Sequence, residues 1–362
     1  MKPKFFRYRN GRIKLPAFFP DATRGVVKML DFKDVEETKT SGVLVNTFHL
    51  WQGLNTKVLE KYGDIGRFMS WNGAVVSDSG GFQVMSQVKK GIVEGKIKDE
   101  GLILYPGKNK RLVFIPEESI RFQTKLGTDM VIVLDDFTDP KSSYKEAKES
   151  VERTLLWAKR SKDEFTKLTK NMEIKPYLLG VVQGGEYLDL REYCTKELVK
   201  IGFDGLGWGG WPFDKNGKIS FKSAEVISKN TPEKYFLHGL GIGKPEDIVK
   251  CVSLGFNIFD CVIPTRDGRH GKLFVFNANS IEKIDVGKKN FYSVLNIDRD
   301  VNSLDSFPIS SACDCLLCKK YSKGYLRHLF KIGDVTAMRL SAIHNLRFYS
   351  ILMQKLELLL TK

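Results

Sequence analysis

Apolar runs alternate with amphipathic stretches along most of the chain, a pattern that indicates buried strands separated by helices. The apolar runs that predict strands cover residues 15–19, 42–47, 74–77, 130–134, 177–182, 203–206, 234–237 and 256–259. The amphipathic stretches that predict helices cover residues 54–62, 119–126, 144–168, 188–201, 223–228 and 245–254. In the longest of these, residues 144–168, glutamate and lysine recur at i,i+4 spacing on the polar face.

A strand–helix alternation of about eight units favours a parallel sheet with helical crossovers, an α/β fold. A (β/α)₈ barrel needs about 250 residues, and residues 15–275 supply them. An open, doubly wound sheet is the competing architecture. Polar residues or glycine follow many of the strands: His49, Asp78, Asp135, Gln183, Gly209 and Asp260. A closed barrel gathers such positions around one mouth, so we favour the TIM barrel.

The pattern changes in two places, which suggests two additions to the barrel. Residues 87–115 are rich in lysine and glycine and predict an inserted small hairpin. After residue 275 a polar run leads to three cysteines and to helices over 323–330 and 335–360. We therefore expect a catalytic barrel at 1–275, with its insertion near 87–115, and a zinc-binding helical subdomain at 276–362.

Asp260 ends an apolar run, and a basic, glycine-containing loop is expected after it, from Pro264 to Gly271. Arg266, Arg269 and His270 in this loop suit a phosphate-bearing ligand. An aspartate at a strand end can also do no more than cap the next turn. On this stretch alone a catalytic role and a capping role are about equally supported.

Asp78 also ends a strand, so in a barrel it faces the same mouth as Asp260. Two carboxylates in one cleft are what glycosidic chemistry requires, one as nucleophile and one as general acid/base. Asp135, Gln183 and the Gly209-Gly210 backbone offer hydrogen-bonding groups for the edge of a base. An aromatic residue near Asp78, Phe82, can stack on such a base.

Three of the six cysteines, Cys313, Cys315 and Cys318, form the pattern C-x-C-x₂-C. With a histidine they make a closed tetrahedral zinc site that has no position for water, so the ion would be structural. His344 is the favoured fourth ligand, and His328 is the second choice. Three reduced cysteines without a metal are the competing interpretation. Cys194, Cys251 and Cys261 lie in apolar surroundings and are expected in the core.

Composition narrows the class of protein. The chain has 362 residues, 42% of them hydrophobic, and a net charge of +15, which suggests a polyanionic partner, with nucleic acid the first candidate. It has no apolar run long enough for a membrane span and no signal-peptide pattern at its N-terminus. Six cysteines are too few for a disulfide scaffold. We therefore expect a cytoplasmic protein.

Motifs in family order over nearly the whole chain resemble the tRNA-guanine transglycosylases, most of all their bacterial branch. They are Ser77 to Gln83, Val182 to Gly185, Gly239 to Pro245, Phe259 to Gly271, and the Cys/His set with Asn345-Leu346. The resemblance implies a (β/α)₈ barrel with a zinc subdomain. It also implies exchange of the wobble guanine of GUN-anticodon tRNAs for 7-aminomethyl-7-deazaguanine, the precursor of queuosine.

The resemblance also assigns roles to single residues. Asp260 matches the nucleophile that forms a covalent ribose intermediate, and Asp78 matches the general acid/base. The positions implied for the base are Ser79, Phe82, Gln83, Asp135, Gln183, Gly209, Gly210 and Leu240, and those implied for tRNA are Thr265, Arg266 and Arg269. One structural zinc ion per subunit, on Cys313, Cys315, Cys318 and His344, and a homodimer are implied as well.

The chain departs from the bacterial pattern at 211–215, where Trp211-Pro212-Phe213-Asp214-Lys215 replaces small apolar residues, glycine and glutamate. Because this segment contacts the 7-substituent in the family, the identity of the incoming base stays open, and queuine is a second candidate. A DNA substrate and a non-catalytic tRNA-binding subunit stay open as well. An ordinary glycosidase would leave the zinc subdomain and the positive charge unexplained.

Overall fold

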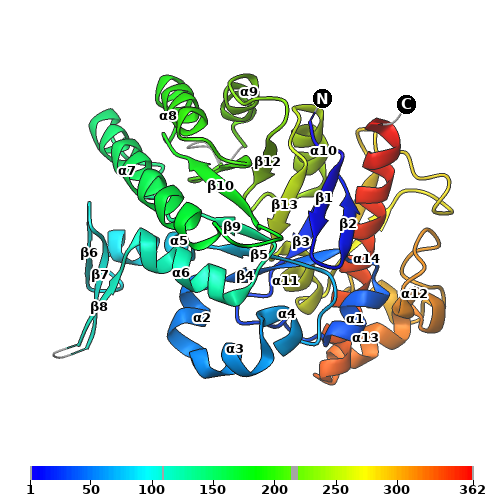
Figure 1. Ribbon diagram of the computed structural model, residues 1–362. Coiled ribbons are helices and arrows are strands. Elements are labelled where there is room, and N and C mark those ends of the chain that lie inside the picture. Colours follow the sequence, from blue (N-terminus) through cyan, green and yellow to red (C-terminus); the bar gives the residue numbers. More distant parts are fainter. Residues whose placement is uncertain (1, 108–109, 213–218, 361–362) are drawn as a thin grey trace.

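The centre of the molecule is an eight-stranded parallel sheet (Figure 1). The structure, a computed structural model, describes residues 2–107, 110–212 and 219–360. Along the chain the strands of the sheet are β3 (Ala17–Pro20), β4 (Gly42–Asn46), β5 (Ala74–Asp78), β9 (Met130–Ile132), β10 (Tyr177–Val182), β11 (Gly205–Trp208), β12 (Phe236–Gly239) and β13 (Ile258–Cys261). Their order in the sheet is β3-β13-β12-β11-β10-β9-β5-β4.

The two edge strands, β3 and β4, come together and nearly close the sheet. Asp21, just after β3, forms a parallel bridge with Leu44. The backbone N–H of Ala22 donates to the Leu44 carbonyl at 2.7 Å, and the N–H of Asn46 donates to the Thr23 carbonyl at 3.1 Å. The prediction of a (β/α)₈ barrel is therefore confirmed.

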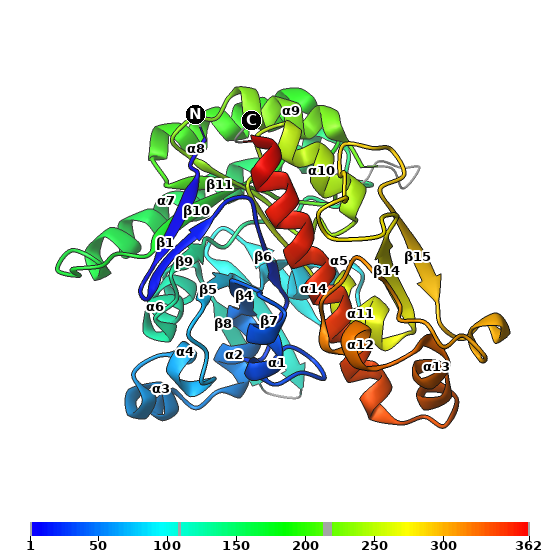
Figure 2. The same ribbon diagram turned by 90° about the vertical axis from the view of Figure 1, so that its right-hand side faces the viewer.

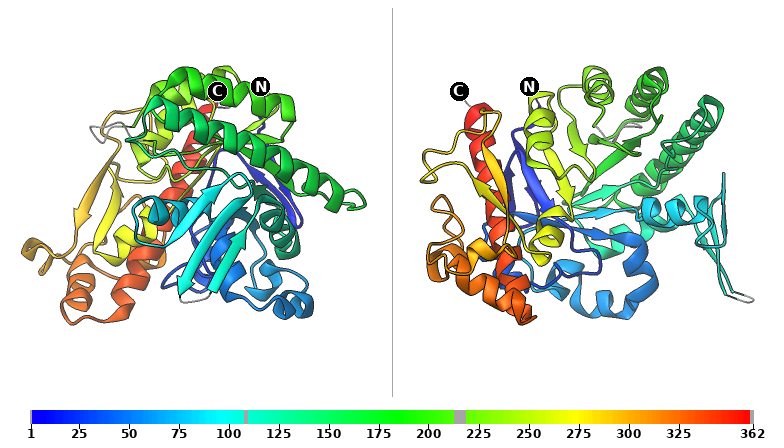
Figure 3. Two further views of the ribbon diagram at one scale, coloured as in Figure 1. Left: turned by 90° about the vertical axis from the view of Figure 1, so that its left-hand side faces the viewer. Right: turned by 180° about the vertical axis from the view of Figure 1, so that it is seen from behind.

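Helices lie between consecutive strands and cover the outside of the barrel (Figures 1 and 3). They are α1 (Phe32–Glu37), α2 (Thr47–Gly53), α3 (Thr56–Tyr62), α4 (Ile65–Phe68), α5 (Gly81–Lys89), α6 (Pro116–Leu126), α7 (Tyr144–Leu168), α8 (Leu188–Ile201), α9 (Phe221–Lys229) and α10 (Pro245–Ser253). Helix α7 has its predicted bounds, because a capping box between Ser143 and Glu146 starts it and one apolar face is buried.

Two strands lie about two residues later than predicted. The apolar runs 203–206 and 234–237 include residues that lead into the sheet, whereas pairing begins at Gly205 in β11 and Phe236 in β12. The Asp204 carboxylate before β11 accepts the N–H of Leu178 on the neighbouring strand, at 2.9 Å. As a result, His238 belongs to strand β12 and not to the loop after it.

The N-terminal end of the barrel is covered by a hairpin that the pattern did not predict, β1 (Phe5–Tyr8) with β2 (Gly11–Lys14). Its Phe6 is fully buried and lies edge-on to Phe19 and Phe236, with ring centroids 6.0 Å apart in both pairs. Basic residues interrupt the alternation of apolar and polar positions in this segment, so its sequence does not predict strands. The buried ring of Phe6 is what packs the hairpin against the barrel.

The inserted segment after α5 is a three-stranded antiparallel sheet and not the predicted small hairpin. It consists of β6 (Gly95–Lys98), β7 (Gly101–Gly107) and β8 (Lys110–Phe114) and projects from the side of the barrel (Figure 3). Leu102, Leu104 and Phe114 are buried in one cluster with Trp157 of α7. This packing holds the third strand, which the polar sequence of the segment did not reveal.

The segment after Asp260 is a helix, α11 (Ile263–Arg269), where a loop was expected. Proline is well accommodated in a first helical turn, so Pro264 does not prevent the helix. Gly268 allows close packing, since a Cβ at this position would lie 2.9 Å from the backbone of Ser341. The helix thus depends on a contact with residues more than seventy positions away, which local patterning does not report.

The C-terminal part begins with an antiparallel pair, β14 (Lys272–Phe276) and β15 (Tyr292–Asn296). A short 3₁₀ turn, η1 (Asp300–Asn302), and the helices α12 (Leu316–Lys320), α13 (Lys323–Lys331) and α14 (Val335–Leu360) follow. Helix α14 returns along the barrel (Figure 2), where Tyr349 packs against Phe18 of β3 with ring centroids 4.6 Å apart. The expected domain boundary after residue 275 falls inside β14, and the division into two domains stays a prediction.

Candidate active site and zinc centre

A cavity of about 590 Å³ opens where the carboxyl ends of the barrel strands converge. (β/α)₈ barrels place their active sites at this end. Ten of the residues singled out from the sequence line it: Asp78, Ser79, Phe82, Gln83, Asp135, Gly209, Gly210, Leu240, Asp260 and Arg266. The cavity is therefore the candidate active site.

Asp260 lies at the end of β13 with 15% of its side chain exposed. Its Oδ1 accepts two hydrogen bonds: from Nε2 of His238 at 2.8 Å and from the backbone N–H of Gly241 at 3.2 Å. Within the described part of the chain, both donors to this carboxylate thus converge on the same oxygen. The protein holds Oδ1, and Oδ2 is left for a ligand.

Asp78 ends β5, and its Oδ2 accepts a hydrogen bond from Nδ2 of Asn46 at 3.3 Å. Burial raises the pKa of Asp78 well above its ordinary value, and the nearby carboxylates of Asp260 and Asp21 raise it further. The same Asn46 side chain caps helix α2, which fixes the position of its amide. The Asp78 carboxyl group is therefore suited to hold and donate a proton near neutral pH.

Asp135 and Gln183 form a polar pair on the cavity wall. Nε2 of Gln183 donates to Oδ2 of Asp135 at 2.5 Å, and Oε1 of Gln183 accepts from the backbone N–H of Thr138 at 3.1 Å. Burial raises the pKa of Asp135 to about 6. Gln183 is fully buried behind Asp135, so of the two it is Asp135 that lines the cavity.

A buried arginine, Arg191 of α8, fixes the backbone on both sides of this pair. Its Nη1 donates to the carbonyls of Val182 at 2.8 Å and Gly209 at 2.7 Å, and its Nε donates to the carbonyl of Gly185 at 3.0 Å. Burial lowers the pKa of Arg191 to about 10. The guanidinium thus ties the glycine-containing loop after β10 to Gly209, which lines the cavity.

Phe82, on α5, has 39% of its surface exposed and forms an aromatic wall of the cavity. Its ring is edge-on to Phe137 at 4.7 Å and nearly parallel to Trp211, with centroids 6.4 Å apart and an interplanar angle of 16°. Gly80 starts this helix with φ +73°, and a Cβ there would lie 2.5 Å from Phe48. The sharp turn at Gly80 thus brings Phe82 to the cavity.

The remaining predicted positions do not all line the cavity. Thr265 and Arg269 lie on α11 but not on the cavity wall: Thr265 is buried, and Nε of Arg269 donates to its carbonyl at 3.0 Å. His49 lies on α2 and does not line the cavity either. Of the departing segment, Trp211 and Pro212 line the cavity, whereas Phe213, Asp214 and Lys215 lie outside the described residues.

The sequence reasoning missed three residues of this site besides Arg191. Asp21 and Lys244 line the cavity, and His238 contacts Asp260 from the barrel interior. Asp21 follows an apolar run just as Asp78 and Asp260 do, so the same signal was available. Burial raises the pKa of Asp21, although the hydroxyl and the N–H of Thr23 donate to its carboxylate.

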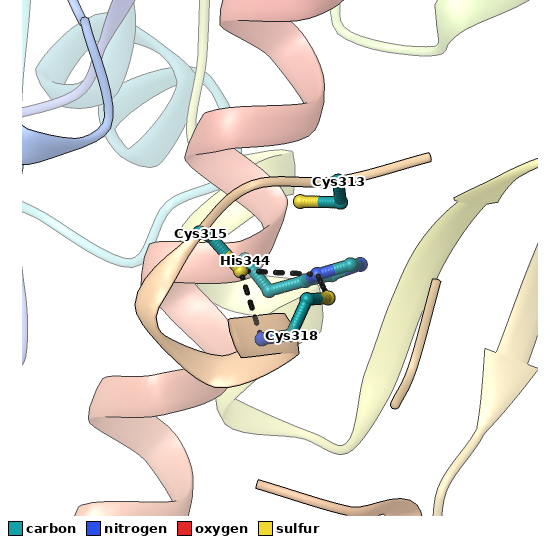
Figure 4. Close-up of side chains that lie close together, drawn as sticks. All are labelled: Cys313, Cys315, Cys318 and His344. Atoms are coloured by element: carbon teal, nitrogen blue, oxygen red, sulfur yellow. Dashed lines mark hydrogen bonds between the residues drawn. The ribbon is translucent and has the colours of Figure 1, made fainter. Parts of the chain in front are cut away.

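Cys313, Cys315, Cys318 and His344 form a compact group whose ligand atoms all lie within 4.8 Å of one another (Figure 4). Nε2 of His344 faces the carbonyl of Phe274 at 2.8 Å, so it carries the proton and leaves Nδ1 free for a metal. That Nδ1 lies 3.3 Å from the Cys318 sulfur and 3.6 Å from the Cys315 sulfur.

Three thiolates and one imidazole match the ligand set and the tetrahedral geometry of a structural zinc site. His328 lies on α13 and is not in the group, which settles the choice of histidine. The Arg347 guanidinium of α14 forms an ion pair with Asp314, between two of the cysteines. Zinc would therefore fasten the cysteine loop to helix α14, and none of its four ligands lines the cavity at the mouth of the barrel.

The other three cysteines, Cys194, Cys251 and Cys261, are also free thiols. Burial raises the pKa of each thiol to about 12. Such thiols are unreactive near neutral pH. Cys194 and Cys251 are core residues, as predicted, and Cys261 is only partly buried at the edge of the cavity.

The fold and the site together define a class: a (β/α)₈-barrel enzyme with acidic residues at its mouth and an appended zinc centre of the Cys₃His type. The family model described as queuine tRNA-ribosyltransferase matches residues 5–358. The chain belongs to this family, and the resemblance stated from the motifs is confirmed.

Relatives agree with this assignment over nearly the whole chain. A queuine tRNA-ribosyltransferase of Vibrio cholerae serotype O1 (strain M66-2) is 39% identical over 351 residues, 97% of this chain and 86% of that protein. That of Vibrio vulnificus (strain YJ016) is 38% identical over 351 residues, 97% and 87% of the two chains. That of Actinobacillus pleuropneumoniae serotype 5b (strain L20) is 39% identical over 346 residues, which are 95% of this chain and 85% of that protein.

Proposed function

We propose that the chain is a tRNA-guanine transglycosylase, a pentosyltransferase that exchanges the wobble guanine of GUN-anticodon tRNAs for 7-aminomethyl-7-deazaguanine. The observation that carries the proposal is the difference between two carboxyl groups in one cavity. Asp260 keeps one oxygen available at the mouth, whereas the pKa of Asp78 is raised well above its ordinary value. Exchange of a base at a glycosidic bond requires both a nucleophile and a proton donor in one site.

In the first half of the reaction, an oxygen of Asp260 attacks C1′ of the ribose. The bond from C1′ to N9 of guanine breaks, its electron pair passes to the base, and the base takes a proton from Asp78. The ribose stays attached to Asp260 as an ester. The tRNA backbone is intact throughout, because only the glycosidic bond is exchanged for a bond to the enzyme.

In the second half, the incoming base gives its N9 proton to the Asp78 carboxylate, and N9 attacks C1′. The ester bond breaks, and its electron pair returns to Asp260 as a carboxylate. Asp78 ends the cycle protonated, as it began. Each step retains the balance of protons, and water is not consumed.

The target base must leave its stack to reach the cavity. Asp135 supports base recognition because a carboxylate accepts from the ring and amino N–H groups of a guanine. Gln183 and Arg191 hold Asp135 and the Gly209-Gly210 backbone from behind. Phe82 offers its exposed ring to the face of the base, and Leu240 offers an apolar side chain on the cavity wall.

Transfer RNA is the polyanion that the net charge of +15 suits. Lys244 and Arg266 line the cavity, where the backbone of a flipped nucleotide needs cations. Arg269 and Thr265 lie on the same helix as Arg266 and are proposed to support the phosphate contact through that helix. Every described helix is too short or too polar to cross a lipid bilayer.

A homodimer is proposed from an exposed apolar surface on the C-terminal part. Val301, Leu304 and Phe307 have 79%, 95% and 72% of their surfaces exposed. The partly exposed rings of Tyr321 and Tyr325 are stacked at 5.3 Å, next to the point where the N–H of Lys323 donates to the Phe307 carbonyl. A second copy of the chain would cover this surface.

The described cysteines form no disulfide, and zinc binding requires the thiols of Cys313, Cys315 and Cys318 to stay reduced. This requirement supports a reducing compartment, the cytoplasm.

The choice of incoming base depends on the segment that begins at Trp211. Trp211 and Pro212 line the cavity, and Pro212 has no backbone N–H to offer a substituent. A bulkier or differently charged 7-deazaguanine, such as queuine, is therefore the second candidate substrate.

Base exchange with labelled guanine is the direct test. The enzyme is expected to incorporate the label into a GUN-anticodon tRNA and not into the same tRNA with adenine at the wobble position. Adding unlabelled 7-aminomethyl-7-deazaguanine or queuine should then chase the label, and the better competitor identifies the base. Tight tRNA binding without incorporation would favour a non-catalytic subunit, and incorporation into the matching DNA stem-loop alone would favour a DNA substrate.

A further inference from the structure

We propose that His238 is a positioning residue for the nucleophile: with the Gly241 N–H it holds Oδ1 of Asp260, so that Oδ2 is the oxygen that attacks the ribose. The inference rests on the proposed function, since it concerns how Asp260 acts in that reaction. His238 was not a candidate in the sequence, and the two half-reactions give it no role of their own.

The geometry starts from the pairing of β12 with β13. His238 pairs with Ile258 and Gly239 pairs with Phe259, so the side chains of His238 and Asp260 come from adjacent strands near the mouth. His238 is fully buried, and its Nε2 lies 2.8 Å from Oδ1 of Asp260. The imidazole therefore reaches Asp260 from inside the barrel, where a substrate does not displace it.

The chemistry of the pair determines where the proton lies. A carboxylate can only accept, so Nε2 of His238 must donate. Its other nitrogen, Nδ1, is buried without a hydrogen-bond partner among the described residues. A proton on Nδ1 would leave a buried donor unpaired, so the neutral Nε2–H tautomer is favoured. His238 thus serves as a fixed donor and not as an acid.

Two donors on one oxygen restrict rotation of the carboxylate, whose terminal torsion is otherwise broad. Both donors remain useful through the reaction. When Oδ2 bonds to C1′, Oδ1 becomes the carbonyl oxygen of the ester and still accepts from His238 and Gly241. When the second base attacks, charge returns to the leaving carboxylate, and the same two donors stabilise it. No proton needs to move on His238 at any step.

The test uses variants that separate the donor from the volume of the side chain. His238→Gln carries an amide nitrogen near the place of Nε2, whereas His238→Leu is similar in bulk and has no donor. His238→Asn is polar, but its amide nitrogen falls short of Oδ1. Leu237→Val, on the same strand and fully buried, is the control for a general disturbance of β12.

The measurement is the single-turnover rate of covalent tRNA–enzyme adduct formation, with the tRNA dissociation constant and the melting temperature determined alongside. His238→Leu and His238→Asn are expected to slow adduct formation by about tenfold to hundredfold. His238→Gln and Leu237→Val should stay within about threefold of the wild type. Binding of tRNA should change by less than about twofold in all four variants, because His238 is too deeply buried to contact it.

Two results would overturn the proposal: wild-type rates in both His238→Leu and His238→Asn, or equal losses in His238→Gln and His238→Asn. If His238→Leu does not fold, the comparison of the glutamine and asparagine variants decides alone. A wild-type protein that forms no adduct with any tRNA would overturn the proposed function itself. An adduct that forms equally fast in all variants would reject only the role of His238.

Discussion

Replacing Asp135 by asparagine is expected to stabilise the protein above pH 6 while it impairs base recognition. Burial raises the pKa of Asp135 from 3.8 to about 6. The folded protein therefore binds more protons at this site than the unfolded chain does between about pH 4 and pH 6. Stability from this group is greatest at low pH and falls as the pH rises through that window.

The magnitude follows from the size of the shift. A pKa difference of about two units corresponds to about 3 kcal/mol once both states are ionised, above about pH 6. Asparagine has nearly the shape of the protonated acid and does not titrate, and its Oδ1 can accept the bond that Gln183 now donates. Asp135→Asn should therefore exceed the wild type in unfolding free energy by up to about 3 kcal/mol at pH 8 and by less than about 1 kcal/mol at pH 4.

Urea unfolding of both proteins at pH 4, 6 and 8 measures this difference. Asp136→Asn is the matched control, because Asp136 is buried and paired with Arg153 at 2.6 Å and with Lys89 at 3.0 Å. Loss of those pairs should destabilise the protein by about 3–5 kcal/mol. The reasoning would be refuted if Asp135→Asn were destabilising at pH 8, or if its effect were the same at pH 4 and pH 8.

Three further substitutions have separable outcomes. Asp78→Asn should slow adduct formation and base exchange at least about hundredfold while tRNA binding persists; unchanged exchange would exclude Asp78 as the acid/base. His344→Ala should lose bound zinc, measured by metal analysis, and lower the melting temperature; full zinc content would remove His344 from the ligands. Arg191→Met removes the side-chain donor from the carbonyls of Gly185, Gly209 and Val182, of which Val182 keeps the backbone N–H of Gly209 at 3.1 Å. The substitution should therefore lower the free energy of unfolding in urea by about 1–3 kcal/mol and raise the KM for the base. Arg191→Lys should restore part of the stability and part of the affinity for the base. Wild-type stability and KM in Arg191→Met would contradict the role of Arg191.

Strongly patterned segments were predictable because their signal is local. Helix α7 has a cap, a polar face and a buried face within its own sequence, and β10 is a continuous apolar run. The zinc cysteines are likewise close in sequence, and strand-end carboxylates pointed to Asp78 and Asp260. These features need no knowledge of distant residues.

The features that sequence reasoning missed depend on distant contacts. The α11 helix packs through Gly268 on the backbone of α14, and the β1–β2 hairpin is defined by one buried ring, Phe6. His238 carries no motif of its own, and its importance appears only when β12 and β13 lie side by side. The roles of Thr265 and Arg269 in tRNA binding stay predictions, since neither side chain lines the cavity.

Covalent trapping tests the central claim most directly. The protein is mixed with an unmodified GUN-anticodon tRNA and a 7-deazaguanine, and the products are separated on a denaturing gel. We predict a shifted band that contains both protein and tRNA, that is absent in Asp260→Asn and that disappears when the incoming base completes the exchange. A band that persists in Asp260→Asn, or no band although the tRNA is bound and its guanine is exchanged, would contradict Asp260 as the nucleophile.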